Sequence, residues 1–191
     1  MGIPRIDTGP MTVAEFYAFT DARPDEEKWE LIDGEAVLNA SPSDLHQLIL
    51  KNLVFSLATL ERRATSWSVI PGIGAFVSNI SRPEPDVMIL PKSAFRTDHP
   101  RRDTQDAIVL FEIMSPSTAS RDLKWKRAAY ASLPALTHYV VVAQDAVDVL
   151  VFARDAGFGD QRFRARNDAI VIPTLDIALP LSDIYHEIDF G

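Results

Sequence analysis

The sequence contains no cysteine, and none of its apolar stretches approaches the roughly 20 residues needed to cross a bilayer. Without cysteine, the chain can form no disulfide bond, thiolate metal site or cysteine nucleophile. Its first residues, MGIPRIDTGPMTV, lack the apolar core of a signal peptide. We therefore expect a cytoplasmic protein that does not associate with a membrane.

Positive charge is also scarce. The chain has 19 lysine and arginine residues against 27 acidic ones, a net charge of −8 and a sequence pI of about 4.9. This balance argues against non-specific coating of nucleic acid, but not against a nuclease, in which a local basic patch contacts phosphates. The candidates for such a patch are Arg62–Arg63, Arg101–Arg102 and the group Arg121, Lys124, Lys126 and Arg127. A solvated surface is the alternative for the first two pairs.

The chain has no internal repeat, low-complexity tract or linker. Its 191 residues, 47% hydrophobic and 24% charged, have the composition of an ordinary globular protein with ample chain for one core. We expect a single domain over residues 1–191.

Periodicity and turn signals predict a mixed sheet flanked by helices, in the α/β (α+β) class, with an N-terminal hairpin. The hairpin is predicted at Trp29–Ala40, because Asp33–Gly34 suits a tight type I′ turn. The predicted helices are Met11–Thr20, Asp44–Arg63, Ser117–Ser132 and a short one within Pro180–Ile188. The predicted strands are Trp67–Ile70, Ala75–Ile80, Asp86–Leu90, Ala107–Met114, His138–Val142, Val147–Ala153, Gln161–Arg166 and Ala169–Ile172, and Lys92–Asp106 is expected to be a surface loop.

Two of the predicted strands each contain a carboxylate. Glu112 interrupts the apolar run Ala107–Met114, and Asp86 opens the strand Asp86–Leu90. A carboxylate in such a run is costly to bury unless it is paired or bound to a cation. Two hard anionic ligands with room for water suit magnesium. We therefore predict a metal site at Asp86 and Glu112; two unrelated acids, one of them salt-bridged, are the alternative.

The helix predicted at Ser117–Ser132 carries a polar stripe. Asp122, Lys126 and Tyr130 recur every four residues and therefore share one face. A lysine beside a metal site would orient the attacking water or offset charge in the transition state. A solvated lysine is the alternative.

The N-terminal half adds two candidates. On the first strand of the hairpin, Glu30 and Ile32 share a face, so Glu30 is a third acid that we expect to point inward. His46 lies in the first turn of the helix predicted at Asp44–Arg63. We expect His46 to be a supporting or surface residue rather than a metal ligand, because a hard oxygen site does not need imidazole.

Two other chemistries lack their motifs. The chain has no Gly-x-Ser-x-Gly elbow of an α/β hydrolase. The sequence PGIG at Pro71–Gly74 is too short for a dinucleotide-binding loop, and no predicted helix follows it.

Several short motifs follow one another in a fixed order. They are WELIDGE around Glu30, His46–Gln47, Pro85–Asp86, and FEIMSPST followed by Asp122, Lys126 and Tyr130. This ordered set resembles the Uma-two family of restriction-endonuclease-like proteins, long classified as a domain of unknown function within the PD-(D/E)XK nuclease superfamily. The resemblance runs from about Met11 to the C-terminus. Its most specific part is E-x-x-S-P-S-T with the lysine and tyrosine downstream.

The resemblance implies a metal-dependent phosphodiesterase fold. Asp86 matches the metal-binding aspartate, Glu112 matches the glutamate of the E-x-K strand motif, and Glu30 matches an acid of the N-terminal motif that would support the metal. The chain departs from the superfamily pattern at Met114, which occupies the usual lysine position. The resemblance implies that the lysine has moved to the following helix as Lys126. Lys124 is the alternative, but it lies off the Asp122, Lys126 and Tyr130 face.

On this basis we expect an endonuclease that uses Mg²⁺ or Mn²⁺ and acts on nucleic acid, DNA rather than RNA. Its catalytic residues would be Asp86, Glu112, Lys126 and Glu30, with His46, Asp122 and Tyr130 in supporting positions, and we expect a homodimer. The alternative is a catalytically silent nuclease-like fold that serves as a binding or assembly module, which Met114 and the low pI favour.

Overall fold

A six-stranded mixed sheet forms the centre of the protein in a computed structural model, which describes residues 9–95, 98–114 and 119–191, the side chains of 119–122 excepted. The strand order is β10-β9-β8-β7-β5-β3. The strands are β3 (Trp67–Pro71), β5 (Val87–Pro91), β7 (Val109–Met114), β8 (His138–Ala143), β9 (Val149–Ala153) and β10 (Asp160–Phe163). Strands β7 and β8 run parallel, and the other neighbouring pairs run antiparallel. The α/β (α+β) class predicted from the sequence is confirmed.

Strand β7 lies inside the sheet and is buried along its whole length. Its alternate residues enter two different apolar clusters: Phe111 faces one side with Val109, and Leu110 faces the other with Met114. Glu112 therefore belongs to the same face as Leu110. A strand buried on both faces explains the nearly continuous apolar run that predicted it.

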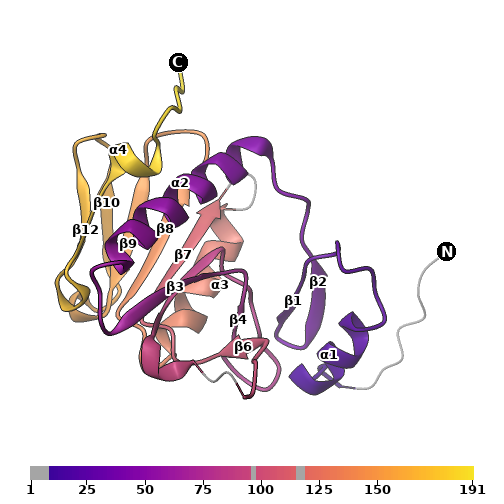
Figure 1. Cartoon of the computed structure of the whole chain (residues 1–191). Coiled ribbons are helices and arrows are strands. Elements are labelled where there is room, and N and C mark those ends of the chain that lie inside the picture. Colours follow the sequence, from indigo (N-terminus) through magenta and orange to yellow (C-terminus); the bar gives the residue numbers. More distant parts are fainter. Residues whose placement is uncertain (1–8, 96–97, 115–118) are drawn as a thin grey trace.

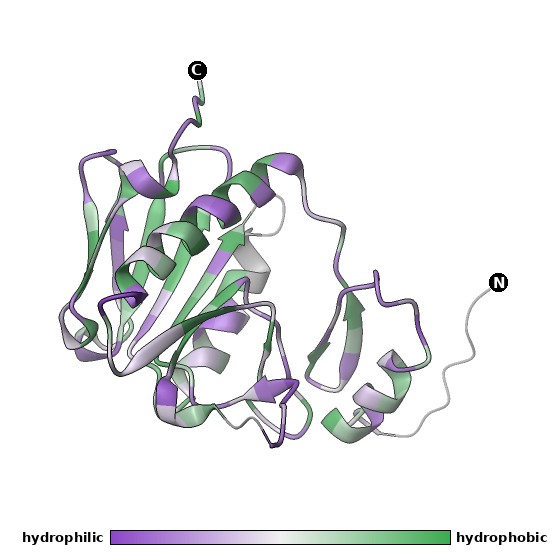
Figure 2. Ribbon diagram, in the orientation of Figure 1, coloured by the Kyte–Doolittle hydropathy of each residue, from purple (hydrophilic) through white to green (hydrophobic). Residues whose placement is uncertain are grey.

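Helices cover the two faces. Helix α2 (Asp44–Glu61), capped by the Ser43 hydroxyl, packs the stripe Ile49, Leu53 and Leu57 onto the Phe111 face. Helix α3 (Ala119–Ala131) connects the parallel strands β7 and β8 and places Tyr130 in the cluster on the Leu110 face. Figure 1 shows α2 crossing one face of the sheet with α3 behind it, and Figure 2 shows apolar residues concentrated along the central strands.

An N-terminal unit lies beside this sheet. Helix α1 (Val13–Thr20), within the range predicted to be helical, begins with a capping box between Thr12 and Glu15. The predicted hairpin is confirmed as β1 (Trp29–Ile32) and β2 (Glu35–Leu38). The hairpin has its own small core with α1, and Leu31 connects it to the rest of the protein through two backbone hydrogen bonds with Arg82 (Figure 1).

The strand predicted at Ala75–Ile80 is wrong. Only Gly74–Ala75 is extended, as β4, and it pairs in parallel with β6 (Asp103–Thr104) inside the segment expected to be a surface loop. The chain reverses between Ser78 and Ser81, whose backbone groups hydrogen-bond to each other while the Ser78 hydroxyl accepts the amide of Ile80. The local side-chain bonds of serine compete here with extension of the strand.

The C-terminal region contains one strand that the sequence did not predict, β12 (Ile177–Pro180). Strand β11 (Ala169–Ile172) pairs with β12 (Ile177–Pro180), and α4 (Leu181–Ile184) follows as expected. No helix in the described part of the chain is long and apolar enough to span a membrane.

The turn of the N-terminal hairpin depends on Gly34. Asp33 and Gly34 have φ values of 49° and 83°, and a Cβ atom at Gly34 would lie 2.2 Å from the Cβ atom of Pro10. The Gly34 backbone also donates to Ile80 and accepts from Met11. The glycine is therefore required both for its conformation and for the close approach of the preceding segment.

We predict that Gly34→Ala lowers the free energy of unfolding by more than Gly72→Ala. Gly72 has a similar φ of 64°, but a Cβ atom there would have no other atom within 4 Å, so its substitution carries only the backbone cost, about 1–2 kcal/mol. Gly34→Ala adds the clash with Pro10. Urea denaturation of both variants measures the difference; equal losses would show that the contact with Pro10 is unimportant.

Candidate functional site

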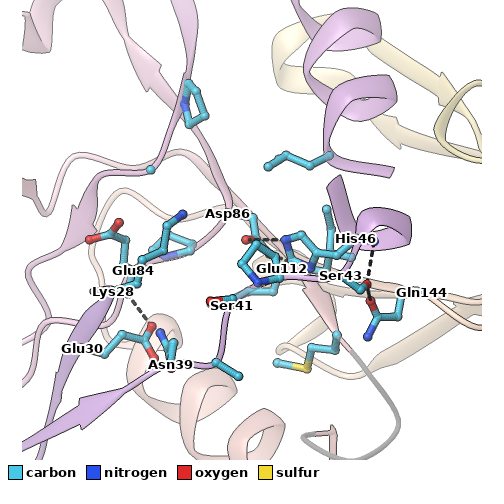
Figure 3. Close-up of a pocket in the computed structure, with 18 of the residues that line it drawn as sticks. Lys28, Glu30, Asn39, Ser41, Ser43, His46, Glu84, Asp86, Glu112 and Gln144 are labelled. Atoms are coloured by element: carbon cyan, nitrogen blue, oxygen red, sulfur yellow. Dashed lines mark hydrogen bonds and ion pairs between the residues drawn. The ribbon is translucent and has the colours of Figure 1, made fainter. Parts of the chain in front are cut away.

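A pocket of about 460 Å³ lies between the N-terminal hairpin and the edge of the central sheet. It is formed where β1, the start of β5, the end of β7, the start of α2 and helix α3 meet (Figure 3). The polar and charged residues that line it are Lys28, Glu30, Asn39, Ser41, Ser43, His46, Glu84, Asp86, Glu112, Lys126 and Gln144. All four residues predicted as catalytic line this one pocket.

The centre of the site is a buried group of one lysine and two glutamates. The Lys126 ammonium lies 2.9 Å from Glu112 Oε1 and 3.1 Å from Glu30 Oε1. The Lys126 and Glu30 side chains are each 5% exposed, and that of Glu112 is 8% exposed. Strand β1, which is distant in the sequence, is thus linked to β7 and α3 by charge-assisted hydrogen bonds in a poorly solvated position.

Glu112 has a second partner on α3. The Tyr130 hydroxyl donates to Glu112 Oε1 at 2.7 Å, so Lys126 and Tyr130, one helical turn apart, hold the same oxygen. Oε2 accepts no hydrogen bond from the residues that the structure describes. Burial raises the pKa of Glu112 to about 8, against the opposing effect of Lys126 and with further increases from the charges of Asp86 and Glu30.

Asp86 lies beside Glu112 because of the strand register. Val87 of β5 pairs with Phe111 of β7, so one residue further Asp86 stands opposite Glu112, with its side chain on the same face. Asp86 Oδ2 accepts the Ile113 amide at 2.7 Å, and Asp86 Oδ1 lies 3.2 Å from His46 Nε2. The Asp86 side chain is 23% exposed and is therefore open to the pocket.

His46 reaches the pocket from the first turn of α2, where the Ser43 hydroxyl accepts its amide hydrogen. Its contact with Asp86 brings it into the pocket with the other candidates, and its supporting role stays a prediction (Figure 3). From this position His46 can orient the Asp86 carboxylate.

One lining acid, Glu84, was not predicted. Its amide donates to Glu30 Oε1 at 2.6 Å, and its carboxylate lies 2.8 Å from Arg82 Nη1. The segment between Pro83 and Pro85 therefore orients Glu30 through the backbone. The signal in the sequence was the second carboxylate in PEPD, but its ion pair with Arg82 depends on the fold.

Of the remaining residues singled out from the sequence, one lines the pocket, one lies outside it, and the others lie outside the described residues. Met114 lines the pocket, so the usual position of the strand lysine is apolar in space as well as in sequence. Lys124 is exposed and lies outside the lining. The SPST segment at 115–118 and the side chain of Asp122 lie outside the described residues.

The candidate basic patches are partly neutralised. Arg101 pairs with Asp106, Arg102 with Asp21, and Arg127 with Asp160. Arg62 and Arg63 are exposed beyond the C-terminal end of α2, which has 18 residues and begins at the pocket. They are therefore about 27 Å from the site.

The next question is whether the side chains of the pocket could bind the Mg²⁺ or Mn²⁺ that was expected. Within the described residues, no group of three or more histidine, cysteine, aspartate or glutamate side chains is arranged to hold a metal ion. The two carboxylates of Asp86 and Glu112, opposite each other and facing an open pocket, nevertheless suit Mg²⁺, which keeps several of its waters and needs only one or two protein carboxylates. The residues fit a two-carboxylate site completed by water.

The mixed sheet with helices on both faces is an α/β fold that a solved nuclease-like structure shares. A solved structure described as "a putative nuclease belonging to DUF820", from Anabaena variabilis, superposes with a TM-score of 0.77 and 14% sequence identity, covering 92% of this chain and 98% of that chain. No protein with a curated description has significant sequence similarity to this chain.

The chain belongs to the Uma2 family, described as "Putative restriction endonuclease". The family model matches residues 13–182, most of the chain. The resemblance recognised from WELIDGE, Pro85–Asp86 and FEIMSPST is therefore confirmed.

We predict that Glu112 gives the folded protein a specific dependence on pH. Its pKa is raised from 4.5 to about 8, so the folded state holds this proton more tightly than the unfolded state. The resulting stabilisation is present below pH 4.5 and is lost as the pH rises through 8. Relative to Glu112→Gln, the wild type should lose stability between pH 5 and pH 8.

Urea denaturation at pH 5, 6.5 and 8 measures this difference in the absence of divalent cations. Glu26→Gln, at an exposed position, is the matched control and should follow the wild type at every pH. A constant difference in stability between wild type and Glu112→Gln across the range would contradict the raised pKa.

Proposed function

We propose that this protein is a metal-dependent endonuclease that hydrolyses phosphodiester bonds, with DNA as its substrate. Asp86 and Glu112 hold Mg²⁺ or Mn²⁺, Lys126 acts as the catalytic lysine, and Glu30 supports it. The proposal is supported by the family of the chain and, above all, by the position of the Lys126 ammonium 2.9 Å from Glu112 in a pocket that also contains Asp86.

A divalent cation bound at Asp86 and Glu112 would polarise a phosphoryl oxygen and lower the pKa of a bound water. The residues of the chain prepare this site. Tyr130 holds one oxygen of Glu112, and Asp86 accepts the Ile113 amide on Oδ2 while its Oδ1 contacts His46 in the pocket lining. Such preorganisation reduces the cost of orienting ligands when the cation binds.

Lys126 supplies the positive charge of the mechanism. Its ammonium is held between Glu30 and Glu112, and the residue as a whole is 4% exposed. In the poorly solvated pocket, this charge offsets the negative charge that develops on the phosphate in the transition state. Glu30 keeps the amine directed at the site and is itself oriented by the Glu84 amide.

We predict that Asp86→Asn weakens the binding of Mn²⁺ by at least about tenfold, because one of two anionic ligands is lost. Isothermal titration calorimetry of MnCl₂ into wild type and variant tests this, with Asp145→Asn, a change at an exposed position, as the control. Equal affinities in all three proteins would remove Asp86 from the metal site.

We predict that Lys126→Gln lowers the rate of metal-dependent DNA cleavage by about 10²–10³, the usual cost of losing one preorganised electrostatic group. The same change leaves Glu30 and Glu112 without their cation, so the melting temperature should also fall. Cleavage is therefore measured well below the melting point of the variant, with folding checked by circular dichroism.

Lys124→Gln is the matched control for Lys126→Gln, because Lys124 lies on the same helix but is exposed and outside the pocket. It should keep the wild-type rate and melting temperature. The reverse pattern, a loss of activity in Lys124→Gln alone, would show that the wrong lysine has been assigned.

The second candidate is a catalytically silent nuclease-like module. It is favoured by the two ion pairs that engage Lys126 and by the apolar Met114 in the usual lysine position. The two proposals differ in metal binding and turnover. A wild-type protein that binds DNA but neither binds Mn²⁺ nor cleaves DNA would favour the silent module.

A further inference from the structure

A second lysine, Lys28, lies at the mouth of the pocket on the open end of the N-terminal hairpin. It precedes β1 directly, and its carbonyl accepts the Asn39 amide at 2.8 Å, which extends the β1–β2 pairing by one position. Lys28 is exposed and contributes to the pocket lining. Figure 3 shows it on the same side of the pocket as Glu30, Asn39 and Glu84.

The strand alternation fixes the side from which Lys28 emerges. Lys28 and Glu30 are two residues apart and share one face of the hairpin, about 7 Å from each other along the strand. Trp29 and Leu31 occupy the opposite face, in the small core with α1. The same strand that directs Glu30 to the buried lysine therefore directs Lys28 to the opening.

The charge of Lys28 is available to a ligand. Two other basic residues line the pocket, and both have partners: Lys126 pairs with Glu30 and Glu112, and His46 contacts Asp86. The ammonium of Lys28 forms no ion pair within the described parts of the chain. Glu84, a half-buried acid in the lining, is already paired with Arg82.

We propose that Lys28 is a phosphate-binding residue that holds the non-bridging oxygens of the phosphodiester next to the one undergoing hydrolysis. This inference rests on the proposed nuclease function. The inner part of the pocket is rich in carboxylates and repels a polyanion except where a bound cation neutralises them. A free ammonium at the entrance attracts the neighbouring phosphate. It thereby determines which phosphodiester of the nucleic-acid strand lies at the metal site.

The rest of the entrance suits the same ligand. Asn39, Ser41 and Gln144 line the pocket and carry neutral hydrogen-bond donors without adding negative charge (Figure 3). Phosphate contacts of this kind position a nucleic acid without reading its sequence. Lys28 therefore contributes to affinity and placement, and Lys126 to the chemical step.

The test measures the binding of a fluorescent DNA oligonucleotide at several salt concentrations, with Ca²⁺ in place of Mg²⁺ to suppress cleavage. Lys28→Gln should weaken binding about threefold to tenfold, and the slope of log affinity against log salt should become shallower by about one. Lys28→Arg should restore both values. Lys124→Gln, which removes the same charge outside the pocket, is the control and should match wild type.

Cleavage assays with Mg²⁺ provide a second measurement. Lys28→Gln should raise KM by the same factor with kcat changed less than about twofold, since the contact is made equally in the ground state and the transition state. Because Lys28 is exposed, the melting temperature should not change.

The outcomes separate the two proposals. If the wild type binds DNA and Lys28→Gln keeps the full salt slope, or if Lys124→Gln reduces it equally, the phosphate contact of Lys28 is wrong and the nuclease proposal stands. If the wild type neither binds nor cleaves any oligonucleotide, the proposed function fails and the role of Lys28 fails with it.

Discussion

The ion pairs of Lys126 with Glu30 and Glu112 join three elements of the fold at one buried point. Glu30 belongs to the N-terminal hairpin, Glu112 to the central strand β7, and Lys126 to the helix that covers it. Removing one partner from a buried ion pair typically costs about 3–5 kcal/mol, because an unpaired charge remains. Together with the backbone hydrogen bonds between Leu31 and Arg82, this group holds the hairpin beside the sheet, and the pocket lies between the two.

The position of the lysine follows from the packing of α3 against the sheet. Glu112 lies on the Leu110 face of β7, the face that α3 covers, and Tyr130 is buried on that same face. Lys126 is one turn earlier on the helix and so reaches the same carboxylate. With the amine supplied from the helix, Met114 on the strand is free to be apolar and packs in the cluster around Leu110.

Much of this arrangement could be predicted from the sequence where local patterns determine the structure. The buried run Ala107–Met114, the Asp33–Gly34 turn and the Asp122, Lys126 and Tyr130 spacing are all short-range signals. The position of Asp86 opposite Glu112 is a matter of strand register, and the contact of His46 with Asp86 is a matter of how α2 packs. The short strands β4, β6 and β12, of two to four residues, are stabilised by their partners, and their sequences carry too little periodicity to reveal them.

The pocket of the free protein contains more carboxylates than cationic groups, and a bound cation would balance them. Arg82 compensates Glu84, and Lys126 is shared by two glutamates, so Asp86 and Glu112 together retain more negative charge than the chain neutralises. In the free protein, burial and the neighbouring acids raise the pKa of Glu112 and so favour its protonated form. A divalent cation that displaces this proton would restore the charge of Glu112 and balance the charges of Asp86, Glu112, Glu30 and Lys126. The ammonium of Lys28 would then add positive charge at the entrance. In this view the acidic protein attracts a polyanion only where its own carboxylates are occupied, and the low overall pI is compatible with a nuclease.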